Sequence, residues 1–78
     1  MLLNEAFGEV LREARLENQL SQEVLAQLAG LHRNSVSNLE RGIFSPTLEN
    51  LFALAEVLGK QPDELVKETK SRMSKPTE

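Results

Sequence analysis

The stretch LSQEVLAQLAGLHRNSVSNLERG, residues 20–42, decides how this chain of 78 residues folds. It contains two short segments with apolar residues at helical spacing, and between them Gly30 marks a turn of about three residues. Ser21 is well suited to cap the first segment. The inward stripe predicted for that segment is Val24, Leu25, Leu28 and Ala29. The second segment is predicted to run from Arg33 to Arg41 and to end before Gly42.

The second segment has unusual side chains on its outer side. If Val36 and Leu39 face inward, helical phase places on the outside Arg33, Asn34, Ser37 and Asn38. Ser and Asn are weak helix formers, so helix stability does not explain this choice. Arg can donate two hydrogen bonds to guanine, Asn can pair bidentately with adenine, and Ser allows close approach. The pattern therefore predicts a surface that reads DNA bases.

Two short helices joined by such a turn form a helix-turn-helix unit, here predicted at about residues 21–41. In this unit the second helix lies in the major groove and the first crosses the phosphate backbone. Gln22, at the start of the first helix, is placed to donate to a phosphate. The alternative is that residues 33–38 are a solvated polar face without a partner, and the flanking architecture disfavours it.

The remaining apolar patterns predict three more helices. Asn4 is the expected cap of a helix that runs to about Asn18 and buries Phe7, Val10, Leu11 and Ala14. Thr47 is the expected cap of a fourth helix that ends at Gly59 and buries Leu48, Leu51, Leu54, Ala55 and Leu58. Pro62 begins a fifth, with Leu65 and Val66 facing inward. We predict an all-α, compact five-helix bundle over residues 1–69, followed by a frayed or disordered tail over residues 70–78.

Composition narrows the class of protein further. The chain has no Cys, so disulfides and thiolate metal sites are excluded, and no segment has the length and hydropathy of a membrane span. We expect a cytoplasmic protein that associates with the nucleoid and is encoded by a bacterium or a phage. The net charge is −3, which opposes nucleic-acid binding at long range. The acids are clustered, however, in a stripe interpreted as a solvated face and made of Glu5, Glu9, Glu13 and Glu17.

Residues 5–68 resemble the Cro/cI-type helix-turn-helix family, which includes small phage repressors and regulators of the xenobiotic-response-element type. The resemblance rests on the pairs Ser21-Gln22, Leu25-Ala26 and Ala29-Gly30, on the Ser-x-x-x-Leu-Glu-Arg-Gly run ending at Gly42, and on Pro46. It implies a fold of the lambda-repressor-like type. It also implies DNA contacts from Gln22, Arg33, Asn34, Ser37 and Asn38, phosphate contacts from Arg41, Ser45 and Thr47, and a structural ion pair between Arg15 and Glu40.

His32 departs from the family pattern, because many relatives carry Ser or Asp as the cap before the recognition helix. Either the helix is capped more weakly, or Asn34 or Ser35 supplies the cap instead. If no substitute cap forms, the exchange costs roughly 0.5 to 2 kcal/mol of stability. A phosphate contact by His32 is a further alternative.

A single recognition helix reads only a few base pairs, so we expect a homodimer on a palindromic site. The apolar residues that exceed the needs of one small core are Phe44, Phe52 and Val66, with Met73 as a further candidate. Short members of the family include controller proteins of restriction-modification systems, and the resemblance extends to them. Phage repressors and antitoxin-type autoregulators remain open.

The sequence therefore predicts a transcriptional regulator that binds double-stranded DNA specifically as a homodimer, with no cofactor, metal, membrane or small-molecule effector domain. The alternative is an antitoxin-like or protein-docking helix-turn-helix module with weak or no DNA binding. An enzyme is disfavoured, since the single His has no neighbouring nucleophile and no Gly-rich phosphate loop is present.

Overall fold

The computed structural model describes residues 1–73 of the chain. Over these residues the chain forms five helices and no strand, which confirms the predicted all-α bundle. The helices are α1 (Leu3–Glu17), α2 (Gln22–Ala29), α3 (Arg33–Glu40), α4 (Leu48–Leu58) and α5 (Pro62–Met73).

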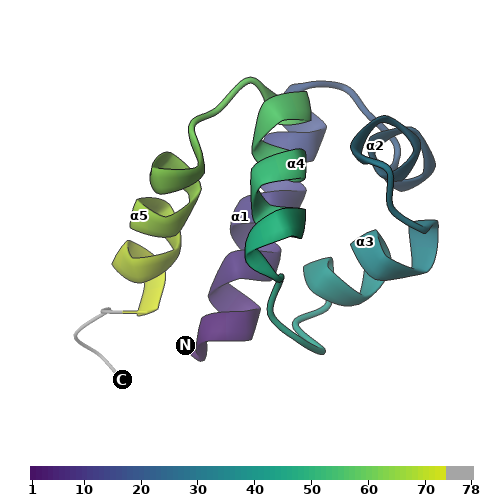
Figure 1. The fold of residues 1–78 in the computed structure, drawn as a ribbon. Coiled ribbons are helices and arrows are strands. Elements are labelled where there is room, and N and C mark those ends of the chain that lie inside the picture. Colours follow the sequence, from purple (N-terminus) through teal and green to yellow (C-terminus); the bar gives the residue numbers. More distant parts are fainter. Residues whose placement is uncertain (74–78) are drawn as a thin grey trace.

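The helices are arranged around a central pair. Figure 1 shows α1 and α4 in the middle, with α2 and α3 on one side and α5 on the other. Helix α1 packs against α3 and α5, and α4 packs against α2 and α5. Helices α2 and α3 also contact each other directly. The first and last helices are therefore neighbours, and α3 lies on the far side of α1 from α5.

The helix ends form largely where the sequence places them. Ser21 Oγ accepts a hydrogen bond from the Val24 amide at 3.0 Å, and Thr47 Oγ1 accepts one from the Asn50 amide at 3.0 Å. Each bond satisfies a donor that the first turn of a helix leaves open. Gly30 ends α2 at φ 73°, a left-handed conformation that glycine adopts without the steric penalty of a side chain. The turn between α2 and α3 is thereby fixed.

One apolar core joins all five helices. The largest side chains that are fully buried in it are Val10, Leu11, Leu25, Val36, Leu39, Leu54 and Leu65. They come from every helix, so each helix depends on the others for the burial of its apolar face. Both inward residues predicted for α3, Val36 and Leu39, belong to this core.

Gly8 allows α1 and α3 to touch through their backbones. A Cβ atom at this position would lie 2.5 Å from the carbonyl oxygen of Glu40 and 2.7 Å from that of Leu39. Both distances are far below van der Waals contact, so any side chain at position 8 would push the end of α3 away from α1. The glycine therefore sets how closely the end of α3 approaches α1.

The predicted cap of α1 is wrong. The helix begins at Leu3 with Leu2 in the N-cap position, and Asn4 lies inside the first turn. The Leu2 amide instead donates to Glu5 Oε1 at 3.1 Å, so the acid three residues further along satisfies the open donor.

Four predicted inward side chains are exposed instead. Leu28 is 61% exposed, and Val24, Leu48 and Val66 also face outward. Helix α2 buries Leu25 and Ala26, which rotates its apolar face by about one residue from the predicted stripe. Leu48 is the first residue of α4 and lies beyond the end of the core, while α5 turns Leu65 and Thr69 inward, four residues apart.

The first part of the predicted tail, residues 70–73, is helical. Helix α5 continues through Lys70 to Met73, and Arg72 makes ion pairs with α1. The remaining part of the expected tail, residues 74–78, lies outside the described residues.

Candidate nucleic-acid interface

Helix α3 presents a polar outer side above its two core residues. Arg33 and Asn34 are exposed, and Ser37 and Asn38 are partly exposed, while Val36 and Leu39 below them are inaccessible to solvent. Among the described residues, these four polar side chains make no hydrogen bond and no ion pair with the rest of the protein. The structure brings together the four residues that the sequence singles out for base reading, with donors and acceptors available to a ligand.

Further polar groups lie at the ends of α2, α3 and α4. Arg41 is exposed at the C-cap of α3, and Ser45 is exposed in the loop that follows. Thr47 uses its oxygen as the cap of α4 and keeps its hydroxyl hydrogen as a donor. Gln22 is half-buried at the start of α2, where its Nε2 donates to Glu40 Oε1 at 2.9 Å. The sequence analysis did not anticipate this last bond.

The ion pair implied by the family resemblance is present and buried. Arg15 Nε lies 2.6 Å from Glu40 Oε2, and Arg15 Nη2 lies 3.0 Å from Oε1, so the pair is bidentate. The two side chains are only 10% and 4% exposed. The hydrogen bond to Glu40 raises the pKa of Arg15 above its ordinary value, which keeps the guanidinium charged. Its Nη1 also donates to the carbonyl oxygen of Leu20 at 2.9 Å, which ties the α1–α2 turn to the pair.

His32 occupies the N-cap of α3 without capping it. Its side chain makes no capping hydrogen bond, and the Ser35 amide donates to the His32 backbone oxygen instead, at 3.0 Å. Within residues 1–73, neither Asn34 nor Ser35 supplies a side-chain cap. The weaker capping expected for this departure from the family pattern is therefore what the chain adopts.

The acidic stripe is not simply a solvated face. Arg72 Nη2 lies 2.6 Å from Glu13 Oε1 and Nη1 lies 2.8 Å from Glu13 Oε2, and Nη1 also reaches Glu9 Oε1 at 3.1 Å. The hydrogen bond from Arg72 lowers the pKa of Glu13. Two acids of the stripe thus hold α5 against α1, so that part of the earlier interpretation is corrected.

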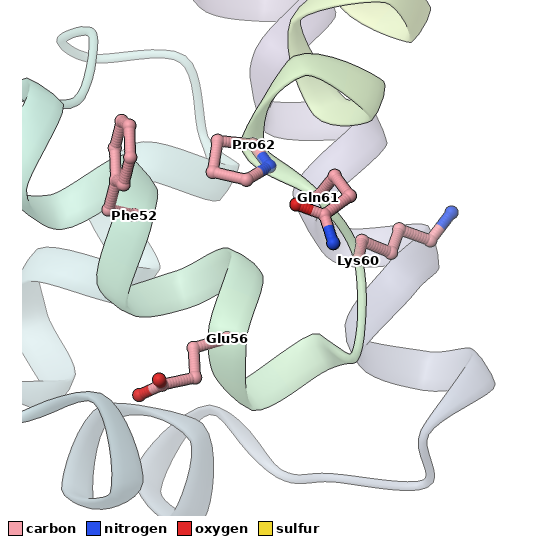
Figure 2. Close-up of a pocket in the computed structure, with 5 residues that line it drawn as sticks. All are labelled: Phe52, Glu56, Lys60, Gln61 and Pro62. Carbon is pink, nitrogen blue, oxygen red and sulfur yellow. The ribbon is translucent and has the colours of Figure 1, made fainter.

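Large apolar side chains are exposed on α4, on α5 and in the loop before them. Phe52 is 59% exposed, and Phe44, Leu48, Val66 and Met73 are also accessible. Beside Phe52 lies an open hollow of about 320 Å³ lined by Glu56, Lys60, Gln61 and Pro62, as Figure 2 shows. The three residues predicted for a dimer interface, Phe44, Phe52 and Val66, are therefore all accessible at the surface.

Residues 1–73 contain neither a membrane-spanning helix nor a cluster of metal-binding side chains. No helix there has the length and apolar character needed to cross a membrane. No group of three or more His, Cys, Asp or Glu side chains in that part of the chain is placed to hold a metal ion.

Comparison with known proteins agrees with the fold. A family model described as helix-turn-helix matches residues 11–65. The control protein C.BamHI of Bacillus amyloliquefaciens is 39% identical over 61 residues, which cover 77% of this chain and 75% of that protein. The crystal structure of the restriction-modification controller protein C.AhdI from Aeromonas hydrophila has a TM-score of 0.77 at 45% identity, over 80% of this chain and 94% of that one.

The DNA-binding domain of the P22 C2 repressor is also similar, with a TM-score of 0.76 and 34% identity over 78% of this chain and 80% of that domain. Fold and sequence thus define a helix-turn-helix transcriptional regulator. The chain belongs to the Cro/cI-type helix-turn-helix family, as the resemblance in its sequence implied, and its relatives include both controller proteins and phage repressors. This is a family of DNA-binding regulators and not of enzymes.

Proposed function

We propose that the protein binds a palindromic operator in double-stranded DNA as a homodimer, with α3 in the major groove, and thereby regulates transcription from a nearby promoter. The observation that carries the proposal is the outer side of α3, where the side chains of Arg33, Asn34, Ser37 and Asn38 have no intramolecular partner among the described residues. A folded protein that leaves these groups unpaired on one helix has them available for an external partner. Base edges in the major groove offer matching donors and acceptors.

The base-reading roles follow from side-chain chemistry. Arg33 in the first turn of α3 is suited to donate two hydrogen bonds to guanine O6 and N7. Asn34 and Asn38 are suited to pair with adenine N6 and N7, and Ser37 lets the backbone come close to the bases. We therefore expect a half-site that contains both a guanine and an adenine contacted by α3.

Phosphate contacts would then set the register of α3 on the duplex. Gln22, Arg41, Ser45 and Thr47 are half-buried or exposed donors at the ends of α2, α3 and α4. Contacts of this kind position a protein without reading sequence. The net charge of −3 opposes DNA binding at long range, but Glu9 and Glu13 of the acidic stripe pair with Arg72 of α5, on the side of α1 away from α3 (Figure 1).

The homodimer is proposed to form through the exposed apolar residues Phe44, Phe52 and Val66. Burying apolar surface stabilises a protein by about 25 cal/mol for each Å² removed from water, so covering an exposed phenylalanine is favourable. A second copy of the chain, related by a two-fold axis, would cover these residues and double the number of bases read. Sedimentation of the protein across a range of concentrations, with Phe52→Ser as the variant, tests the dimer. A monomer at micromolar concentration would contradict it.

Selection of bound sequences from a random duplex library at near-physiological salt tests the proposed DNA binding. Wild type should enrich a palindrome with half-sites about one helical turn apart, and Arg33→Ala and Asn38→Ala should lose it. Lys67→Ala, an exposed charge on α5, removes the same charge as Arg33→Ala away from α3 and should keep the site. Absence of any enriched sequence would favour the alternative of a protein-docking module.

A further inference from the structure

Glu40 lies at the meeting point of three helices. It is the last residue of α3, it is paired with Arg15 on α1, and it accepts a hydrogen bond from Gln22 at the first position of α2. Its side chain is 4% exposed, so DNA lying on the surface cannot touch it. Any influence of Glu40 on DNA binding must therefore pass through a neighbouring side chain.

The hydrogen bonds determine how the Gln22 amide is oriented. Because a carboxylate only accepts hydrogen bonds, the Gln22 side chain must turn its nitrogen toward Glu40, and it does so at 2.9 Å. One N–H is used in this bond, and the second N–H points away from the carboxylate and remains available. A side-chain amide without this partner would rotate freely and would present its carbonyl oxygen to a phosphate as readily as its nitrogen.

Arg15 makes this arrangement compatible with DNA. A lone carboxylate beside a phosphate-binding group would repel the phosphate, but the bidentate pair with Arg15 cancels the charge of Glu40. Arg15 also holds the carbonyl oxygen of Leu20, directly before the Ser21 cap of α2. The same guanidinium thus fixes the end of α3 and the start of α2.

We propose that Glu40, whose charge is balanced by Arg15, is a positioning residue for DNA binding and orients the Gln22 amide so that its free N–H donates to a phosphate. This inference rests on the proposed function. The hydrogen bond between Gln22 and Glu40 links the start of α2 to the end of α3. The phosphate contact of Gln22 would therefore fix the position of α3 along the DNA.

Non-additivity of substitutions tests the inference. Removing only one partner of the buried Arg15–Glu40 ion pair would leave an unpaired charge and threaten the fold. Both partners are therefore replaced, as Arg15→Met with Glu40→Met, because well-packed apolar replacement of a buried ion pair is often tolerated. This double variant and Gln22→Ala should each weaken operator binding about tenfold per half-site, the effect of one lost hydrogen bond to a charged group. The triple variant should bind no more weakly than Gln22→Ala alone.

A matched control separates positioning from general damage. The pair Glu13→Met with Arg72→Met removes an ion pair between α1 and α5, on the side of α1 away from α3, and should leave operator affinity unchanged. If the triple variant instead binds about tenfold more weakly than Gln22→Ala, Glu40 acts structurally and the inference is overturned. If Gln22→Ala binds as wild type does, the inference fails while the proposed function stands.

A measurement on the free protein tests the orientation without DNA. In wild type the side-chain amide of Gln22 should be rigid by ¹⁵N relaxation, and in the Arg15→Met/Glu40→Met variant it should become mobile while backbone order at α2 is retained. Equal mobility of the Gln22 amide in both proteins would overturn the inference. If wild type selects no sequence from the library, the proposed function fails, and the phosphate-contact part of this inference fails with it.

Discussion

Replacing Gly8 by Ala should destabilise the protein, although helix propensity alone predicts the opposite. Ala in a helix interior is favoured over Gly by about 1 kcal/mol. At this position, however, the new Cβ would lie 2.5 Å and 2.7 Å from two backbone carbonyl oxygens of α3, and neither oxygen can move without shifting that helix. Overpacking of this kind costs about 3 kcal/mol at the upper end of its usual range.

The net loss is therefore about 2 kcal/mol, which for a domain of this size lowers the melting temperature by about 8 to 16 °C. Thermal unfolding followed by circular dichroism at 222 nm measures it. Arg12→Ala, an exposed position on the same helix, is the control and should change stability by less than about 0.5 kcal/mol. If Gly8→Ala melts at or above the wild-type temperature, the reasoning about backbone contact between α1 and α3 is refuted.

Three further changes test other parts of the structure. His32→Ser should raise the free energy of unfolding by about 0.5 to 1 kcal/mol in urea denaturation, because α3 lacks a side-chain cap, and an unchanged value would contradict this. Arg72→Met should lower stability at neutral pH. Arg72 lowers the pKa of Glu13 from its ordinary 4.5, so the ion pair stabilises the fold above about pH 4.5 and this stabilisation is lost as the pH falls through the lowered pKa. Wild type and Arg72→Met should therefore become equally stable in acid. A constant difference between their urea denaturation curves across this range would argue against the pair. Leu28→Gln should change stability by less than about 0.5 kcal/mol because Leu28 is exposed, while Leu25→Gln should abolish cooperative thermal unfolding because Leu25 is buried. Similar losses in both variants would show that α2 buries Leu28 as well, as the sequence predicted.

The sequence predicts the number of helices and the polar side of α3 well, because both depend on local signals. Ser21, Gly30 and Thr47 mark helix ends through bonds to nearby backbone groups, and such bonds need no distant partner. The outer side of α3 follows from only two strongly apolar residues, Val36 and Leu39, whose spacing leaves a single possible inward face.

The apolar face of α2 could not be predicted in the same way. This helix has only eight residues, and the predicted stripe differs from the buried one by a rotation of about one residue. More than half of the side chains of α2 are apolar, so which of them become buried depends on where α3 and α4 lie. Local periodicity does not contain that information.

The hydrogen bond between Gln22 and Glu40 was missed for a related reason. Gln22 and Glu40 are 18 residues apart and Arg15 and Glu40 are 25 apart, so only the family resemblance suggested the second contact and nothing suggested the first. A glycine inside a helical pattern, as at position 8, is a usable signal of close approach. It gives no indication of which helix approaches.

The packing of α5 on α1 has a consequence for how the protein assembles. Because the first helix is covered by the last, the core around Leu11 stays open until Leu65 has been synthesised and has docked. Folding by stepwise addition of helices from the N-terminus is then unfavourable, and the molecule should acquire its structure in one cooperative transition. Removal of α5 would accordingly abolish the fold as a whole, including the polar surface of α3 on the opposite side of α1, rather than leave a shorter folded protein.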